Sequence, residues 1–110
     1  MNARERRVGL NEALFRRINE RLEGINEALG WLAGRLHVVC ECGDEGCVER
    51  ITLTADEYER LRADPTTFAV VRGHDDPPVE SVIEERGEWV VVRKRPGGPA
   101  ELATRTDERT

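Results

Sequence analysis

All three cysteines of this 110-residue chain lie in one short segment, VVCECGDEGC at 38–47, as Cys40, Cys42 and Cys47. Thiolates are preferred ligands of zinc, which structural sites hold in a tetrahedron of four sulfur or imidazole ligands. Gly43 and Gly46 give the segment between the cysteines the backbone freedom that a tight turn needs. The spacing therefore predicts a zinc site in which three thiolates leave one position for a neutral fourth ligand.

Two histidines are candidates for that fourth position. His74 follows a predicted strand in a loop rich in Gly and Pro, from which its ring can reach a neighbouring hairpin. His37 lies in the strand that leads to the cluster, and a regular strand places it on the face opposite Cys40. We expect His74 to be the ligand, with His37 as the alternative. The carboxylates of Asp44 and Glu45 are weaker candidates, because structural sites rich in thiolates seldom use them.

Other interpretations of the cysteine cluster remain open. A redox switch, in which oxidation ejects the metal, still holds zinc at rest. A disulfide is less favoured, because Cys40 and Cys42 are a poor pair within one strand and a third thiol is left over. The odd cysteine count, and a start (MNARERRVGLNEALF) without the long apolar core of a secretory signal, favour the reducing cytoplasm.

Two resemblances extend this interpretation. The C-x-C-x4-C spacing resembles the zinc-binding segment that follows SET methyltransferase domains, although the rest of the chain has no SET pattern and no fourth cysteine. More broadly, NEALFRRINERL, VCECGDEGC, ITLTADEYERLRADPTTFAVVRGH and EWVVVRK are similar to an uncharacterised family of short actinobacterial proteins. That resemblance implies that His74, in the GH pair, belongs with the cysteines, and it implies no activity.

The sequence lacks the motifs that are typical of catalysis. Neither histidine lies in the H-x-E pattern of zinc deaminases or in H-E-x-x-H, and there is no P-loop, G-x-G-x-x-G or G-x-S-x-G. The acidic pair Glu84 and Glu85 falls in a predicted strand beside a turn, which is typical of a solvated face. We expect a protein that is not an enzyme, with Zn²⁺ as its cofactor and no small-molecule substrate.

The elements that must position the cluster form an α+β fold. Residues 11–36 predict an amphipathic helix that begins at Asn11 and carries a heptad seam of Asn11, Phe15, Ile18, Leu22, Ile25, Leu29, Leu32 and Leu36. Such a seam packs either on its own domain or across a dimer. We favour a homodimer or a protein partner bound through Phe15, Ile18, Leu22, Ile25, Leu29 and Leu32.

The rest of the chain predicts a small antiparallel β body with one short helix. LHVVCE (36–41) and VERITLT (48–54) form a hairpin with the cysteines at its tip. Thr54 and Glu57 form a capping box that begins a short helix, and TTFAVVR (66–72) is a further strand. A second hairpin pairs VESVIEE (79–85) with EWVVVRK (88–94) and sets Ile83 opposite Val90.

The predicted organisation has three parts: the helix at 1–37, the zinc-binding body at 38–95 and a disordered tail at 96–110. Net charge is −5, with +2 on residues 1–37 and −6 on residues 38–95. A nucleic-acid binder needs a basic face, and only Arg4, Arg6, Arg7, Arg16, Arg17 and Arg21 supply one. A nucleic-acid regulator is therefore the alternative to a zinc-stabilised interaction protein. The sequence has no apolar run of about 18 residues, so it predicts no membrane span.

Overall fold

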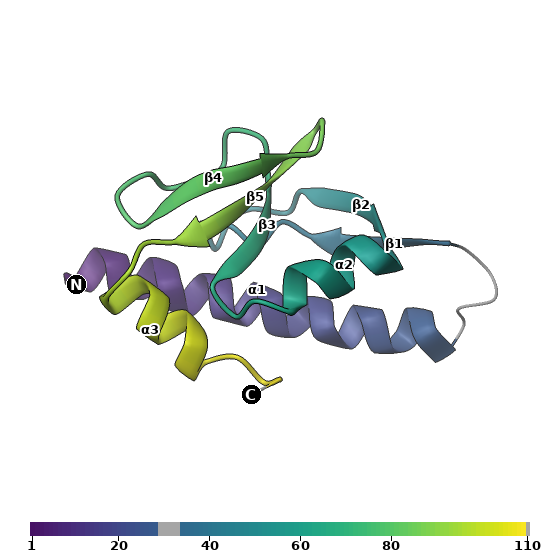
Figure 1. The fold of residues 1–110 in the computed structure, drawn as a ribbon, viewed down its shortest axis with the longest axis horizontal. Coiled ribbons are helices and arrows are strands. Elements are labelled where there is room, and N and C mark those ends of the chain that lie inside the picture. The colour runs from purple at the N-terminus through teal and green to yellow at the C-terminus, as the bar shows by residue number, and fades with distance from the viewer. Residues whose placement is uncertain (29–33, 110) are drawn as a thin grey trace.

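The computed structural model describes residues 1–28 and 34–109, with side chains described for 1–25 and 34–109. Its α+β architecture confirms the predicted fold class (Figure 1). The elements in chain order are α1 (Ala3–Ala28), β1 (Arg35–Val39), β2 (Arg50–Thr54), α2 (Ala55–Arg62), β3 (Thr67–Val71), β4 (Glu80–Glu85), β5 (Trp89–Lys94) and α3 (Gly98–Arg105). None of the helices in these described ranges is long and apolar enough to cross a membrane.

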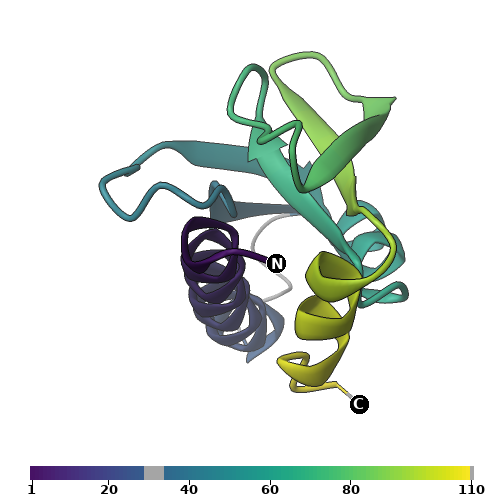
Figure 2. The same cartoon turned by 90° about the vertical axis from the view of Figure 1, so that its left-hand side faces the viewer.

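The strands form two small antiparallel sheets. One pairs β1 with β2, and the other has the order β3-β5-β4. The first hairpin is confirmed, with Val38 opposite Ile51 and the cysteine segment at its tip. The capping box before α2 is also confirmed, because the Thr54 side chain accepts from the Glu57 amide and the Glu57 side chain accepts from the Thr54 amide. Viewed end on, α1 and α3 lie beneath the sheets (Figure 2).

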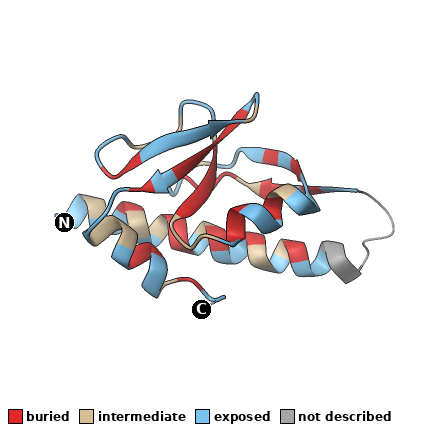
Figure 3. Ribbon diagram, viewed as in Figure 1, coloured by how far each residue is buried: buried red, intermediate tan, exposed pale blue. Residues whose placement is uncertain are grey.

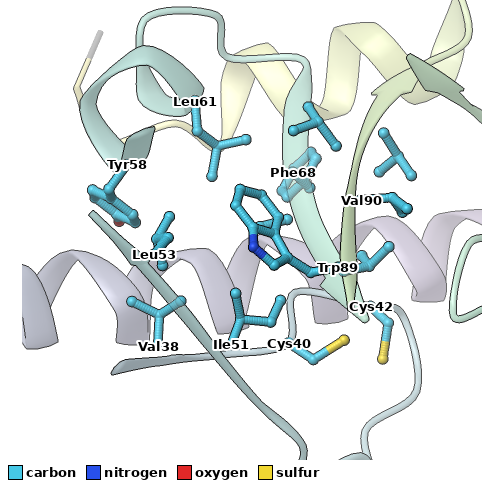
Figure 4. Packing of buried hydrophobic residues seen from close by; sticks show 14 of the residues in the cluster. Val38, Cys40, Cys42, Ile51, Leu53, Tyr58, Leu61, Phe68, Trp89 and Val90 are labelled. Carbon is cyan, nitrogen blue, oxygen red and sulfur yellow. The ribbon is translucent and has the colours of Figure 1, made fainter. Parts of the chain in front are cut away.

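The apolar core lies where the two sheets and α2 meet. Figure 4 shows Val38, Ile51 and Leu53 of the first sheet facing Tyr58 and Leu61 of α2 and Phe68, Trp89 and Val90 of the second sheet. The strands bury these side chains because apolar residues alternate along β1 and β2, whereas β3 and β5 are apolar on both faces. The side chains of Cys40 and Cys42 extend this core into the loop between β1 and β2, residues 40–49, which we call the metal loop because it carries the three predicted cysteine ligands.

The predicted helix at 11–36 is wrong at both ends. Asn2 and Glu5 cap an earlier start: the Glu5 amide donates to Asn2 Oδ1 over 2.8 Å, and the Asn2 amide donates to Glu5 Oε1 over 3.1 Å. Asn11 therefore lies inside α1, where its side chain donates to the Gly43 carbonyl over 3.0 Å. Leu36, the last seam residue, lies in β1 opposite Leu53. The seam positions Leu29 and Leu32 lie outside the described residues.

The side of α1 that faces the body is mostly polar. Six positions on its described part are buried, and four of them carry polar side chains: Glu12, Arg16, Asn19 and Glu23, beside the apolar Val8 and Ala13. Of the predicted seam, Phe15 and Leu22 are half-buried, whereas Ile18 and Ile25 are exposed. Figure 3 shows buried, intermediate and exposed positions following one another along α1. The hydrophobic pattern therefore identified a helix without identifying the face that packs on the body.

Buried polar groups on α1 are matched by partners on the body. Lys94 of β5 lies between the carboxylates of Glu12 and Glu80, and all three side chains are at most 2% exposed. Arg16 Nη1 and Nη2 donate to the carbonyls of Pro65 and Ala103 over 2.6 and 2.7 Å. Burial, reinforced by the neighbouring carboxylate of Glu80, raises the pKa of Glu12 well above its ordinary value. The contacts of Glu12 with Lys94 and the hydrogen bonds of Arg16 thus dock α1 on the body.

The register predicted for the second hairpin is wrong. Glu84 lies opposite Val91 and Val82 opposite Val92, so Ile83 is bulged out of the ladder and is 43% exposed. The turn has three residues, 86–88, with Gly87 at φ +83° and the Arg86 amide donating to the Trp89 carbonyl. An extra residue in β4 of this kind sends the following side chains to the other face of the sheet.

The predicted disordered tail is also wrong. Residues 98–105 form α3, which packs on α1 and β5 and buries Leu102 and Ala103. Pro99 lies in its first turn, where a missing N–H is tolerated. Beyond it, Asp107 is buried against Arg62 of α2. Eight residues are too few for a helical period to stand out, and long-range contacts hold the segment in place.

Candidate metal centre

The structure brings together the four predicted ligands. The sulfur atoms of Cys40, Cys42 and Cys47 and a ring nitrogen of His74 all lie within 4.8 Å of one another. The cysteines come from the loop between β1 and β2, and His74 comes from the loop that follows β3. The group therefore joins the two sheets, and it can hold one metal ion.

Backbone hydrogen bonds shape the cysteine loop. The Cys40 amide donates to the Glu49 carbonyl over 3.0 Å, which continues the β1–β2 ladder to the first ligand. At the tip, Asp44 Oδ1 accepts from the Gly46 amide over 2.9 Å, and the Asp44 carbonyl accepts from the Cys47 amide over 3.0 Å. Asp44 is exposed and acts as a turn former, as aspartate does in turns generally. The turn folds the chain back so that Cys47 meets Cys40.

A second turn presents His74. The His74 amide donates to the Val71 carbonyl over 2.8 Å, and Gly73 takes a φ of +89° that L side chains rarely adopt. The ring nitrogen Nδ1 then lies 3.6 Å from Cys40 Sγ and 3.7 Å from Cys47 Sγ. The alternative histidine faces away: His37 is exposed, and its Nδ1 lies 3.1 Å from Thr52 Oγ1. Strand alternation thus separates the two histidines as expected.

The distances within the group fit tetrahedral coordination. Zn–S bonds of about 2.3 Å and Zn–N bonds of about 2.0–2.1 Å at tetrahedral angles imply an S···N separation of about 3.6 Å. The two observed separations, 3.6 and 3.7 Å, agree with this value. His74 is therefore placed relative to Cys40 and Cys47 as a tetrahedral site requires, and Cys42 lies within 4.8 Å of all three.

Electrostatics of the thiols also favour a cation. Hydrogen bonding from Cys40 lowers the pKa of Cys42 to about 5, so Cys42 is the first thiolate. Its charge raises the pKa of Cys40 through the shared hydrogen bond, followed by burial. Burial first, and then Cys42, raises the pKa of Cys47. Three thiolates so close together repel one another, and a bound metal ion removes that repulsion.

Backbone amides stabilise each sulfur. The Val71 amide donates to Cys40 Sγ over 3.2 Å. A hydrogen bond from the Asp44 amide helps to lower the pKa of Cys42, and one from the Glu49 amide offsets part of the rise in the pKa of Cys47. Such contacts orient ligands in metal sites and share the negative charge of the thiolates.

The metal loop also covers the outer edge of β3. The Ala69 amide donates to Glu41 Oε1 over 3.0 Å, and the Glu41 amide donates to the Ala69 carbonyl over 2.8 Å. With the Val71 amide on Cys40 Sγ, two successive outward amides of β3 are held by side chains of one loop. Glu41 and Cys40 thereby occupy the place that a neighbouring strand would take.

Asn19 of α1 completes this support. Its Nδ2 donates to Glu41 Oε2 and to the Val39 carbonyl, each over 2.8 Å, and its Oδ1 accepts from the Val39 amide over 2.7 Å. Sequence reasoning missed both Asn19 and Glu41. A glutamate between two ligands looks like a solvated turn residue, and a lone asparagine carries no motif, so no signal in the sequence marked either one.

A surface hollow of about 430 Å³ opens beside the ligands. Its lining includes Cys42 and His74, and an ion pair of 3.1 Å between Arg4 of α1 and Asp76 lies at the same hollow. Cys47 and His74 are only partly buried, whereas Cys40 and Cys42 are buried. The hollow gives solvent, and an incoming metal ion, a route to the site.

Searches against protein-family models, curated proteins and solved structures found no match to this chain. The interpretation of the site therefore depends on its own geometry and chemistry.

Proposed function

We propose that this protein is a small, non-catalytic interaction protein whose fold is stabilised by zinc bound to Cys40, Cys42, Cys47 and His74. The observation that carries the proposal is the Cys3His group with its near-tetrahedral spacing. Thiolates and imidazole suit zinc, and four protein ligands leave no open position for a substrate or an activated water. That ligand count supports a structural role for the metal.

Zinc would act as a cross-link in this chain. The site ties the β1–β2 loop to the loop after β3, and β3 belongs to the other sheet. Small domains with a limited apolar core benefit from such a link. Metal binding in small zinc domains is worth on the order of 10 kcal/mol, which is comparable with the stability of a whole domain. The reducing cytoplasm expected from the unpaired thiols would keep the ligands available.

The interaction surface in this proposal is α1, which would bind a second copy or a protein partner. Ile18 and Ile25 of the predicted seam are exposed, and Phe15 and Leu22 border them. The arginines suggested for nucleic-acid binding give that alternative less support. Arg16 is buried within the protein, and Arg4 and Arg17 form ion pairs with Asp76 and Glu108.

Metal analysis of matched variants tests the proposal. The untagged protein, purified without chelators in reducing buffer, should contain one zinc per chain by elemental analysis. His74→Ala should weaken zinc retention against a competing chelator at least tenfold, whereas His37→Ala should retain zinc as the wild type does. Cys47→Ser should lose the metal. Absence of metal from the fresh, reduced wild type would contradict the proposal and would favour a metal-free thiol site that senses oxidation.

A further inference from the structure

The outward side of α1 is apolar although the helix is already docked. We call this surface the outer face of α1; its exposed apolar side chains are Leu10, Leu14, Ile18 and Ile25, at 44%, 49%, 37% and 58% exposure. Helices of globular proteins normally turn such a stripe toward the core. Leu10, Leu14 and Ile18 follow one another at intervals of four residues, which is the ridge that packs into the grooves of another helix. The outer face therefore has the form of a helix-binding surface.

The charges around this stripe have a single sign. Every charged side chain that is exposed on the described part of α1 belongs to an arginine: Arg4, Arg6, Arg7, Arg17 and Arg21. Arg4 and Arg17 already form ion pairs with the body and the carboxyl-terminal segment. The side chains of Arg6, Arg7 and Arg21 form no ion pair within the described residues, and they lie on the same side as the stripe.

The acidic residues of α1 whose side chains the structure describes are occupied elsewhere. Glu5 caps the helix, and Glu12 is paired with Lys94. Glu20 accepts from Arg62 and Arg109, and Glu23 accepts from Arg109. In a chain of net charge −5, the outer face is thus a local region of positive charge. Its composition favours an acidic occupant with apolar side chains of its own.

We propose that the outer face of α1 docks an acidic amphipathic helix of a partner protein. This rests on the proposed function and specifies the partner that the interaction surface takes. The partner's apolar ridge covers Leu10, Leu14 and Ile18, and its flanking carboxylates neutralise Arg7 and Arg21. A second copy is disfavoured, because two outer faces in contact set arginine against arginine. Nucleic acid would neutralise the arginines but leave the apolar stripe against phosphates.

Two matched probe peptides test the proposal. The first is a 21-residue helical peptide with Leu at the a and d positions of each heptad and Glu at the e and g positions; the second has Lys in place of Glu. Fluorescence anisotropy should show the full-length protein binding the Glu peptide at least tenfold more tightly than the Lys peptide. Arg7→Glu with Arg21→Glu should reverse this preference, and Leu14→Gln should weaken both complexes.

Arg50→Glu with Arg105→Glu is the control, since it makes the same charge change at exposed sites outside α1. This variant should bind as the wild type does. Equal binding of the two peptides, or no binding, would overturn the proposal. So would a wild-type dimer that Leu14→Gln dissociates in sedimentation, which would assign the face to a second copy. Binding to anionic vesicles in place of the peptide would assign it to a membrane. Zinc content measured on the same samples keeps this result separate from a failure of the metal site.

Discussion

The metal loop and α1 meet the same requirement, the burial of polar groups, in opposite ways. At the metal loop, the buried thiols of Cys40 and Cys42 continue an apolar core. The thiols converge on one candidate ion site, and the Glu41 carboxylate binds one strand edge. Along α1, charged and amide side chains make up most of the buried side, together with Val8 and Ala13, while Leu10, Leu14, Ile18 and Ile25 face outward. A buried polar group is tolerated where its partners are complete, whatever the hydrophobic pattern of its element.

The two regions should therefore respond differently to change. An apolar core loses stability gradually as side chains are trimmed, whereas a buried polar network is costly once a single partner is missing. Metal ligation belongs to the second kind, because all four ligands act on one ion. The following variants separate these behaviours, beginning with the largest expected effect.

Loss of a metal ligand should have the largest effect. Cys42→Ala should lower the free energy of unfolding by several kcal/mol, up to on the order of 10 kcal/mol, because binding of the metal is coupled to folding. Thermal unfolding followed by circular dichroism, with and without a chelator, measures it. Val48→Ala is the control in the same loop, since Val48 is 85% exposed. Equal melting of Cys42→Ala and the wild type would contradict a structural metal.

Amide hydrogen exchange along β3, measured after a chelator has removed the metal, tests this prediction in more detail. The amides of Ala69 and Val71 point to the metal loop. Thr66 and Arg72, which flank β3, form backbone hydrogen bonds with Lys94 and Glu88. Because backbone groups alternate in direction along a strand, the amides of the even-numbered residues of β3 point to β5. Metal removal should accelerate exchange at Ala69 and Val71 more than at the even-numbered amides. Uniform acceleration along β3 would show that the loop does not protect this edge separately.

Removal of the buried lysine should have the next largest effect. Lys94→Met leaves the carboxylates of Glu12 and Glu80 buried without their cation, at a cost of about 3–5 kcal/mol. Urea unfolding measures this loss. Adding Glu12→Gln should recover part of the stability, because one of the two unpaired carboxylates is then neutral. A loss below about 1 kcal/mol would contradict ion pairing as the means of docking α1.

One polar-to-apolar and one apolar-to-polar substitution test whether α1 packs through its polar side and exposes its apolar side. Asn19→Leu should destabilise by about 2–3 kcal/mol, because Val39 and Glu41 lose their partners in a buried site. Leu14→Gln should change the stability of the isolated chain by less than about 0.5 kcal/mol, since Leu14 is exposed. Urea unfolding of both variants measures these changes in the free energy of unfolding. A larger loss from Leu14→Gln would mean that the outer face is packed in solution.

Acid should release contacts of α1 through Glu20. Burial alone would raise the pKa of Glu20, but hydrogen bonds from Arg109 and Arg62 outweigh it, so that its pKa lies below the usual 4.5. The stabilisation that comes from a lowered pKa is fully present above pH 4.5, and it is lost as the pH falls through the pKa of the folded state. The stability advantage of the wild type over Glu20→Gln should therefore be full at pH 7 and should shrink as the pH falls below 4.5.

The elements near the metal site could be predicted well from local signals in the sequence. Alternation along β1, the Thr54–Glu57 box and the glycine beside His74 each act over a few residues, so both turns and the choice between the histidines followed from them. The buried side of α1 could not be predicted in this way. Glu12 and Arg16 look like surface residues in the sequence, because their partners Lys94 and Ala103 come near only in the folded chain. The bulge at Ile83 and the helix α3 likewise depend on contacts distant in sequence.

X-ray absorption at the zinc edge of the purified metalloprotein tests the Cys3His centre most directly. We predict three sulfur neighbours at about 2.3 Å and one nitrogen at about 2.0–2.1 Å, with the nitrogen shell replaced in His74→Ala and retained in His37→Ala. Fewer than three sulfur neighbours, or an oxygen shell in the wild type, would contradict the assignment of Cys40, Cys42, Cys47 and His74 as the ligands of a closed structural site.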